Sequence, residues 1–288
     1  MTAFEYTGWP NLTLVGSVLR REYAFALGLT CCIPALRYVL HTAVYQPLAR
    51  RVLCSNASTK TGSIPAKVVR LVDKSCESLW KLTVYASLLA LGLYALHDQA
   101  YLTDSTEFWK GWPSQNIPAK VKLYYGVEGA FYTASVFMLL FWEERRKDFH
   151  AMMLHHVATS SLIAASYFFS YARVGSIVML LHDPSDVFLE GAKLCNYADW
   201  DLPATTLFAA LLVSWLALRL VLLPFWVVGS CLFEVQDVLG YLPRYNRAMS
   251  GVLCLLIVLH IYWFSMIARI AWDKITTGCA SDSREDED

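Results

Sequence analysis

Long apolar stretches recur along this chain and are separated by shorter polar stretches. A helix needs about 20 mostly apolar residues to cross a hydrocarbon core about 30 Å thick, so the pattern predicts membrane-spanning helices. Seven segments meet this requirement, near residues 24–46, 78–97, 121–142, 151–170, 175–192, 203–232 and 249–271. Pro184 should kink the fifth segment, and the sixth is long enough to tilt or to bend at Pro224. The predicted fold class is an all-α polytopic membrane protein with seven transmembrane helices.

The composition agrees with a membrane protein and argues against several other classes. Hydrophobic residues make up 56% of the chain and the mean hydropathy is +0.40, which is more apolar than a soluble domain needs. The 24 basic and 24 acidic residues cancel, so no net field would draw the protein to nucleic acid. The eight cysteines form no Cys-x-x-Cys pair, which argues against a disulfide framework or a zinc ribbon. The first twenty residues lack the pattern of a signal peptide, so the first transmembrane helix is expected to direct targeting.

Basic residues predict which helix ends face the cytosol, because short cytosolic loops are enriched in Lys and Arg. The loops after the first and third segments carry Arg50, Arg51, Lys60, Lys67, Arg70, Lys74, Arg145, Arg146 and Lys147. Both loops are therefore expected in the cytosol. With seven spans, this places the N-terminus in the lumen and the acidic tail, residues 273–288, in the cytosol.

Two modification sites follow from this orientation. Asn11, in Asn-Leu-Thr, is predicted to be glycosylated in the lumen, whereas Asn56, in Asn-Ala-Ser, should stay unmodified in the cytosol. Ser283 lies in the acidic context that casein-type kinases favour and is a candidate phosphorylation site in a tail expected to be disordered. A tail that only improves solubility is an equally good interpretation.

Ionisable side chains gather in the fourth and fifth segments, where burial in a membrane makes each one costly and therefore a candidate for function. They are His155 and His156 in the fourth segment and His182, Asp183 and Asp186 in the fifth. His155 should lie roughly 10 Å from the cytosolic face and Asp186 roughly 17 Å from the lumenal face, at about 1.5 Å per residue. These depths sum to about the membrane thickness, roughly 30 Å. The five residues are therefore predicted to meet at one level, nearer the cytosol, as the catalytic group.

Other uses of these residues are open. His155 and His156 could be a hydrogen-bonded pair that holds two helices together, and Glu128 and Arg219 suit an interhelical pair or acid partners better than catalysis. A zinc site made by His155 or His156 with His182 and an Asp stays open on ligand type, although its spacing is no known zinc signature. A di-iron site of the desaturase type is disfavoured, because the chain has seven histidines and neither an HxxxH nor an HxxHH pattern.

The stretch from Lys147 to Tyr197 resembles the signature of ceramide synthases. It contains His155-His156, Ser166-Tyr167, Arg173-Val174-Gly175, His182-Asp183-Pro184-Ser185-Asp186, Leu189-Glu190 and Lys193-Leu194-Cys195-Asn196-Tyr197. Flanking matches extend the resemblance over most of a TLC domain, at Glu77-Ser78-Leu79-Trp80-Lys81, at Tyr124-Tyr125 with Glu128, and at Arg219 with Pro224-Phe225-Trp226. Pro184 and Ser170 depart from the usual pattern. The loop after the first segment is also too short for the homeobox-like insert of many animal members.

The resemblance implies a six-helix TLC bundle plus one N-terminal helix. Its domain layout is a lumenal segment (1–23), a first transmembrane helix (24–46), a basic cytosolic loop (47–77), the TLC catalytic domain (78–272) and the acidic tail (273–288). Residues expected to bind substrate or support the site are Ser166, Arg173, Glu190, Lys193, Asn196, Tyr197, Glu128 and Arg219.

The resemblance also implies an activity, the N-acylation of a sphingoid long-chain base by fatty acyl-CoA in the membrane of the endoplasmic reticulum. No cofactor is expected to be bound permanently, and acyl-CoA is a co-substrate. Membrane lipids are expected partners, nucleic acid is not, and a homo-oligomer, a hetero-oligomer or a small regulatory subunit is left open.

By the same resemblance His155 is the central group, either accepting the acyl chain as an acyl-imidazole or acting as a base toward the amine. Asp186 would orient the imidazole and stabilise its cationic form. His156, His182 and Asp183 would complete a proton path. Two other classes are weaker: a non-enzymatic TLC protein should lack the HH and HDxxD groups, which are intact, and a lipid transporter should show the broken segments of an inverted repeat.

Overall fold

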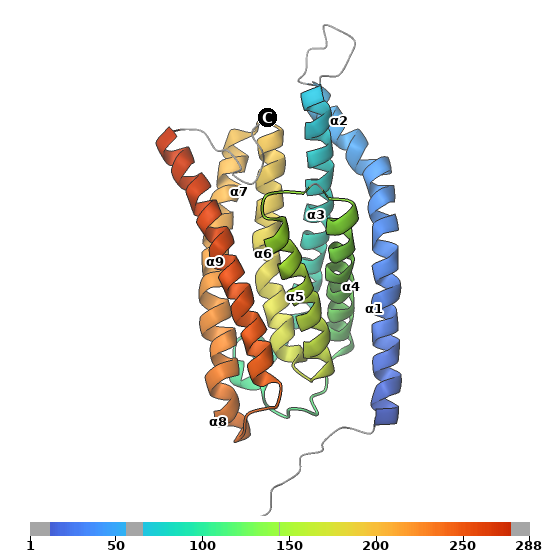
Figure 1. Ribbon diagram of the computed structural model, residues 1–288, viewed down its shortest axis with the longest axis vertical. Coiled ribbons are helices and arrows are strands. Elements are labelled where there is room, and N and C mark those ends of the chain that lie inside the picture. The colour runs from blue at the N-terminus through green and yellow to red at the C-terminus, as the bar shows by residue number, and fades with distance from the viewer. Residues whose placement is uncertain (1–11, 56–65, 144, 278–288) are drawn as a thin grey trace, which may run out of the picture.

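The computed structural model describes residues 12–55, 66–143 and 145–277, and over these residues the chain is almost entirely helical with no β-strand. The described elements form seven long helical segments. These segments run side by side as a bundle (Figure 1). The first joins α1 (Leu12–Leu40), η1 (His41–Tyr45) and α2 (Gln46–Ser55). It is followed by α3 (Ala66–Leu96), α4 (Ala119–Phe141), α5 (Phe149–Phe168) and α6 (Ala172–Tyr197). The sixth joins α7 (Asp201–Ser214), η4 (Trp215–Val228), η5 (Ser230–Glu234) and α8 (Val235–Leu239), and the last is α9 (Asn246–Thr277).

The helix α6 lies inside the bundle and packs against α3, α5, α7 and η4. In Figure 1, α1 and α9 lie at opposite edges, with α1 against α4 and α9 against α5 and η4. We call the end that carries α2 and α7 the upper end and the end that carries α8 the lower end, as they appear in Figure 1. The connection from α4 to α5 and the last turns of α6 and α9 lie at the upper end.

The bundle has an apolar exterior and an ionisable interior. Four segments among the described residues are long and apolar enough to cross a membrane: Arg21–Leu53, Ala66–Leu96, Asp201–Leu239 and Asn246–Thr277. Large apolar side chains such as Phe141 and Phe225 are mostly exposed, whereas His155 and Asp183 are buried. This arrangement is expected where lipid replaces water around the protein. The chain is therefore a multi-pass membrane protein.

The remaining three long helices, α4, α5 and α6, carry most of the buried ionisable residues. Glu128 lies on α4, His155 and His156 on α5, and His182, Asp183 and Glu190 on α6. Among the described residues, these three helices are not in the set of four segments that meet the length and composition requirement for a membrane span.

The first helix is longer than the apolar segment that predicted it. It is continuous from Leu12 to Ser55, and the described parts of the predicted loop 47–77 are helical, as α2 and the first turns of α3. The requirement for about 20 apolar residues identifies only the part of a helix that lies in the hydrocarbon core. It therefore misses polar turns that extend beyond the core.

The two prolines behave differently. α6 runs without a break through Pro184 from Ala172 to Tyr197. Around Pro224 the backbone hydrogen bonding is of the π type over Trp215–Val228, and the helical segment continues to Leu239. A proline lacks the backbone donor that an α-helix needs, and a π-helical stretch is one way to accommodate that loss.

The connection between α3 and α4 folds across the lower end and contains the 3₁₀ turns η2 (Ala100–Leu102) and η3 (Ser105–Phe108). Trp109 is buried there and donates from Nε1 to Ser230 Oγ at 2.9 Å. Arg173, at the start of α6, donates to the backbone carbonyls of Glu107 and Lys110. These hydrogen bonds hold the connection between α3 and α4 against the lower ends of the helices.

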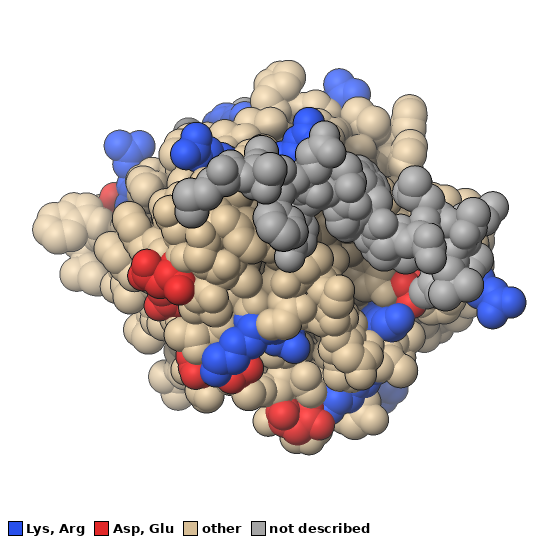
Figure 2. Space-filling view, turned by 90° about the horizontal axis from the view of Figure 1, so that it is seen from below, with Lys and Arg blue, Asp and Glu red and all other residues tan. Residues whose placement is uncertain are grey.

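Acidic and basic side chains are interspersed on the lower face (Figure 2). They include the ion pairs of Lys120 with Asp98 at 2.6 Å and of Lys122 with Glu22 at 2.9 Å. The predicted modification positions Asn11, Asn56 and Ser283 lie outside the residues that the structure describes.

Candidate active site

A cavity of about 220 Å³ lies in the upper half of the bundle, enclosed by α3 to α7, η4 and α9. We call it the upper cavity. Its polar lining comprises Lys81, Tyr85, Tyr132, Ser135, Glu143, Arg146, His155, His156, Asp186, Glu190, Lys193, Asn196, Arg219 and Lys274. Most of the charged residues belong to the upper end of the bundle, and His155 and Arg219 lie deeper. The upper cavity therefore leads from a charged mouth to a buried imidazole.

His155 and His156 are neighbours on α5 but face different partners, since adjacent residues on a helix point about 100° apart. The His155 ring lies 5.4 Å from the Trp263 ring, 6.0 Å from the His260 ring and 6.5 Å from the His182 ring, measured between centroids. The His156 ring lies 5.9 Å from that of Tyr132 on α4. Nδ1 of each of the two α5 histidines is buried without a hydrogen-bond partner. These two Nδ1 atoms are therefore free to act on a ligand.

His182 is fixed by two contacts. Its Nδ1 lies 2.6 Å from the Val178 carbonyl oxygen, and its Nε2 lies 3.1 Å from Nε2 of His260 on α9. A carbonyl only accepts, so His182 carries its proton on Nδ1 and, as a neutral ring, accepts at Nε2. His260 must then donate from its own Nε2. His260 was not among the predicted site residues.

Asp186 is bound by Arg219. Arg219 Nη2 donates to Asp186 Oδ2 at 2.7 Å and to the His182 carbonyl at 2.6 Å, and the guanidinium lies 4.1 Å from the centre of the Trp215 ring. The partner of Asp186 is thus a guanidinium rather than the His155 imidazole that the sequence suggested. The sequence suggested that Arg219 and Glu128 form an interhelical pair or act as partners of acids. In the structure Arg219 is the partner of an acid, and that acid is Asp186.

Asp183 lies outside the upper cavity. It is completely buried and accepts a hydrogen bond of 3.4 Å from Tyr124 Oη on α4, where Glu128 is also completely buried. The carboxyl groups of Asp183 and Glu128 lie within hydrogen-bond reach of each other, and Tyr124 is the neighbour of both. This acid pair joins α4 to α6 behind the cavity wall, and the predicted place of Asp183 in a proton path has no support from the cavity lining.

Ion pairs surround the mouth of the upper cavity. Lys81 lies 2.7 Å from Glu77 and 2.9 Å from Glu143, which also lies 3.1 Å from Arg37, and Lys193 lies 2.8 Å from Glu190. Burial alone would raise the pKa of the Glu143 carboxyl, but Lys81 and Arg37 outweigh it and hold the pKa below its ordinary value. Glu143 is therefore ionised and ties α1 and α3 to the connection between α4 and α5.

The other predicted residues divide between the two ends. Glu190, Lys193 and Asn196 line the upper cavity. Ser166 lies below it, with its Oγ 3.2 Å from Tyr125 Oη, and Arg173 holds the lower connection. Tyr197 ends α6 and does not line either pocket.

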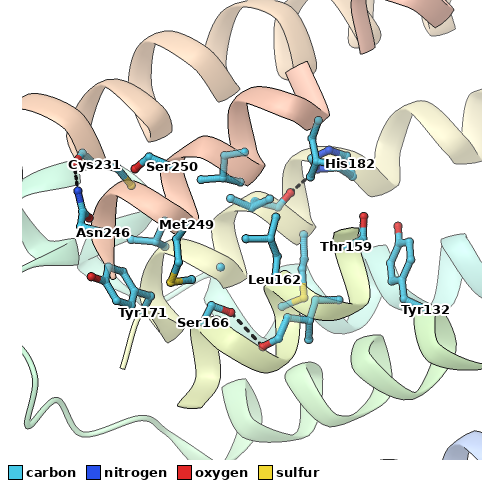
Figure 3. A pocket seen from close by; sticks show the side chains of 17 residues that line it. Tyr132, Thr159, Leu162, Ser166, Tyr171, His182, Cys231, Asn246, Met249 and Ser250 are labelled. Carbon is cyan, nitrogen blue, oxygen red and sulfur yellow. Dashed lines mark hydrogen bonds between the residues drawn. The ribbon is translucent and has the colours of Figure 1, made fainter. Parts of the chain in front are cut away.

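A second, mostly apolar pocket of about 50 Å³ lies beneath the histidines, between α5, α6, η5 and α9 (Figure 3). We call it the lower pocket. Tyr132 lines both pockets, and His182 stands at the upper end of the lower pocket near Thr159. The two spaces adjoin at the level of the histidines, which would allow one long ligand to extend through both.

The described residues contain no group of three His, Cys, Asp or Glu side chains placed to hold a metal ion. The zinc alternative therefore gains no support from the geometry.

Comparisons with known proteins show the family of this chain. A family model for the TLC domain matches residues 74–269. The chain is 36% identical over 273 residues to ASC1-like protein 3 of Oryza sativa subsp. japonica, covering 91% of this chain and 94% of that protein. It is 38% identical over 268 residues to ceramide synthase LOH2 of Arabidopsis thaliana, covering 88% of each. Ceramide synthase hyl-2 of Caenorhabditis elegans is 33% identical over 262 residues, covering 88% of this chain and 79% of that protein. The chain therefore belongs to the TLC-domain family and, within it, to the ceramide synthases.

Proposed function

We propose that this protein joins the acyl group of a fatty acyl-CoA to the amine of a sphingoid long-chain base, giving ceramide or dihydroceramide and free CoA. The observation that carries the proposal is the position of His155, a buried imidazole deep in a cavity with a charged mouth. The relatives that are named ceramide synthases support the same activity.

The charges at the mouth suit the CoA moiety. The basic side chains at the mouth of the upper cavity are Lys81, Arg146, Lys193 and Lys274. Phosphate groups are attracted by Lys and Arg, and guanidinium binds them in a bidentate manner. CoA would therefore stay at the upper end while its thioester reaches His155, and the acyl chain would continue toward the apolar lower pocket.

The proposed chemistry centres on His155. In the covalent route a ring nitrogen of His155 attacks the thioester carbonyl, the carbon–sulfur bond breaks, and CoA leaves as a thiolate that then takes a proton. The amine next attacks the acyl-imidazole, loses a proton and releases the imidazole. In the direct route the amine attacks the thioester while His155 takes its proton. A bundle interior with little water suppresses hydrolysis of the thioester in either route.

The neighbours of His155 would hold the site rather than react. The pair of Asp186 with Arg219 and the contact of His182 with His260 fix the helices around the imidazole. His156, in the same cavity, is the group we assign to stabilise the oxyanion of the tetrahedral intermediate.

We further propose seven membrane spans in the endoplasmic reticulum, with the upper end in the cytosol. The basic residues Arg50, Arg51 and Arg146 belong to segments at the upper end, which supports that orientation. Acyl-CoA would then reach the cavity mouth from the cytosol, and the N-terminus would be lumenal.

The test is N-acylation of sphinganine by palmitoyl-CoA with the purified full chain in detergent. His155→Ala should abolish product formation, whereas His150→Ala should not, because His150 lies on the same helix but is exposed. Intact-mass measurement after palmitoyl-CoA alone separates the two routes, since only the covalent route leaves an acyl group on the protein. Product formation by His155→Ala at a rate near that of the parent would overturn the proposal.

A further inference from the structure

The end of the lower pocket that lies away from the histidines holds polar atoms that have no partner. Tyr171 Oη, Asn246 Oδ1 and Ser250 Oγ are each buried without a hydrogen bond, in residues that are 4%, 1% and 3% exposed. All three residues line the pocket, and Figure 3 shows them together at the end away from His182 and Thr159. An apolar pocket thus ends in a polar cluster.

Such a cluster is unusual because an unsatisfied buried polar atom is costly, and native structures contain few of them. The protein itself satisfies only the other half of the Asn246 amide, whose Nδ2 donates to the Cys231 carbonyl at 2.6 Å. The amide oxygen is therefore presented as an acceptor. The hydroxyls of Tyr171 and Ser250 can each donate or accept. Together they offer the complementary groups that a single hydroxyl requires.

The pocket around the cluster carries no charged side chain, which favours a neutral ligand group. Among the described residues that line the lower pocket none is Lys, Arg, Asp or Glu. A carboxylate or an ammonium group would lie there without a counter-ion, at a cost far above that of a neutral hydroxyl. The group that fits is therefore an alcohol.

The distance from His155 matches a long acyl chain. The rings of His155 and His260 lie 6.0 Å apart, so they are at one level of the bundle. Ser250 and Asn246 precede His260 on α9 by about 10 and about 14 residues, which is roughly 15 Å and roughly 21 Å at about 1.5 Å per residue. An extended backbone advances about 3.3–3.6 Å per three bonds, so these spans correspond to about 13 to about 19 bonds of an extended chain.

We propose that the lower pocket binds fatty acyl chains that carry a hydroxyl on or next to their terminal carbon, with Tyr171, Asn246 and Ser250 as its hydrogen-bond partners. The inference rests on the proposed function, because it is the acyl group of the substrate that extends from His155 into the lower pocket. It assigns a substrate class to that site: ω-hydroxyacyl and (ω−1)-hydroxyacyl thioesters of about 13 to 19 carbons, the length set by the spacing above.

The test is an equilibrium binding competition on the purified full chain with palmitic, 16-hydroxypalmitic and 2-hydroxypalmitic acids. The third acid has the same polarity as the second but places its hydroxyl at the opposite end. Tyr171→Phe combined with Ser250→Ala removes two hydroxyls and no other heavy atom. Ser265→Ala is the matched control, because Ser265 is exposed on the same helix and bonds only to its own backbone turn.

The parent should bind 16-hydroxypalmitic acid at least as tightly as palmitic acid. The double variant should lose about tenfold in affinity for 16-hydroxypalmitic acid alone, which is the effect of one buried hydrogen bond of about 1.4 kcal/mol. Ser265→Ala should match the parent. A parent that binds 16-hydroxypalmitic acid tenfold more weakly than palmitic acid, or a double variant that weakens all three acids equally, would overturn the proposal and leave the cluster to ordered water.

A parallel assay of sphinganine N-acylation by palmitoyl-CoA keeps the two questions separate. No ceramide product with an intact preference for the terminal hydroxyl would refute the proposed activity and retain the site. Ceramide product without that preference would refute the site and retain the activity.

Discussion

The Nε2 atoms of His182 and His260 lie 3.1 Å apart and join α6 to α9 beside His155. Because His182 Nδ1 donates its hydrogen bond to the Val178 carbonyl, His182 Nε2 is an acceptor, and the bond between the two rings runs from His260 to His182. The backbone carbonyl of His260 also accepts from Trp215 Nε1 at 3.1 Å. His260 thus connects η4, α6 and α9 around the candidate catalytic imidazole.

His260→Ala removes the donor and leaves His182 Nε2 buried without one. We expect the free energy of unfolding to fall by about 1–3 kcal/mol and N-acylation to fall about tenfold or more, because the wall beside His155 loosens. Thermal unfolding and the palmitoyl-CoA assay measure both effects. His260→Gln, which keeps an N–H donor at a similar reach, should recover part of each. Parent-like activity and stability in His260→Ala would show that the contact between the rings is dispensable.

Arg219→Met leaves the mostly buried Asp186 carboxylate, whose side chain is 16% exposed, without its cation. Losing one partner of a buried ion pair costs about 3–5 kcal/mol, so this variant should be strongly destabilised. Combining it with Asp186→Leu removes both charges and should restore most of the stability while activity stays low. Thermal unfolding of the two single variants and the double variant gives the interaction free energy. Equal instability of the single and the double variant would contradict this account.

Depth along the chain was sufficient to bring His155 and Asp186 into one cavity, because both depths are measured on helices that cross the same slab. Depth alone does not give the direction in which a side chain points around its helix. Positions three apart on a helix differ by about 60°, and here that difference turns Asp183 toward Glu128 on α4 while Asp186 meets Arg219. Which neighbour stands on each side depends on helix packing, which no single sequence displays.

His260 shows a signal that was present in the sequence and not used. It is an ionisable residue in the middle of the last apolar segment, and the cost of burying such a residue in a membrane singled out His155 and His182 on the same grounds. His260 lies far along the chain from the other histidines, so the sequence alone does not indicate that it contacts His182. The contact that makes it part of the site is a product of the tertiary fold.

Lowering the pH should reduce the stability of the upper end of the bundle, because the ion pairs of Glu143 are lost when its carboxylate takes up a proton. The pKa of this carboxyl is held below its ordinary value by Lys81 and Arg37, so its ion pairs contribute full stability above the unfolded pKa of about 4.3 and lose it as the pH falls through the lower folded pKa. Lys81→Met brings the folded pKa closer to the unfolded one and should flatten this part of the stability profile. Thermal unfolding between pH 3 and pH 6 checks it, with Lys110→Met as control because Lys110 pairs with Glu107 at the exposed lower end. A profile for Lys81→Met that is as steep as the parent's would contradict the assignment.

Gly175 on α6 lies in contact with the side chains of α4 and α5. A Cβ at this position would overlap Tyr125 Oη and would lie 2.8 Å from Ser166 Oγ, closer than these atoms can approach. Gly175→Ala should therefore lower the free energy of unfolding by about 1–3 kcal/mol, although alanine is the better helix former by about 1 kcal/mol.

The matched control is Gly251→Ala on α9, where a Cβ would meet nothing within 4 Å. Only the helix propensity acts there, so this variant should be neutral or more stable by up to about 1 kcal/mol. Adding Tyr125→Phe to Gly175→Ala removes the hydroxyl oxygen that the Cβ would overlap and leaves the ring carbon at 3.1 Å. The double variant should recover part of the lost stability, because the remaining contacts need shifts of only a few tenths of an ångström and a rotation of Ser166. Since Gly175 and Ser166 both line the lower pocket, the same change should also weaken palmitic acid binding. If Gly175→Ala unfolds at the same temperature as Gly251→Ala, α4 and α6 do not approach as closely at this level as the structure has them.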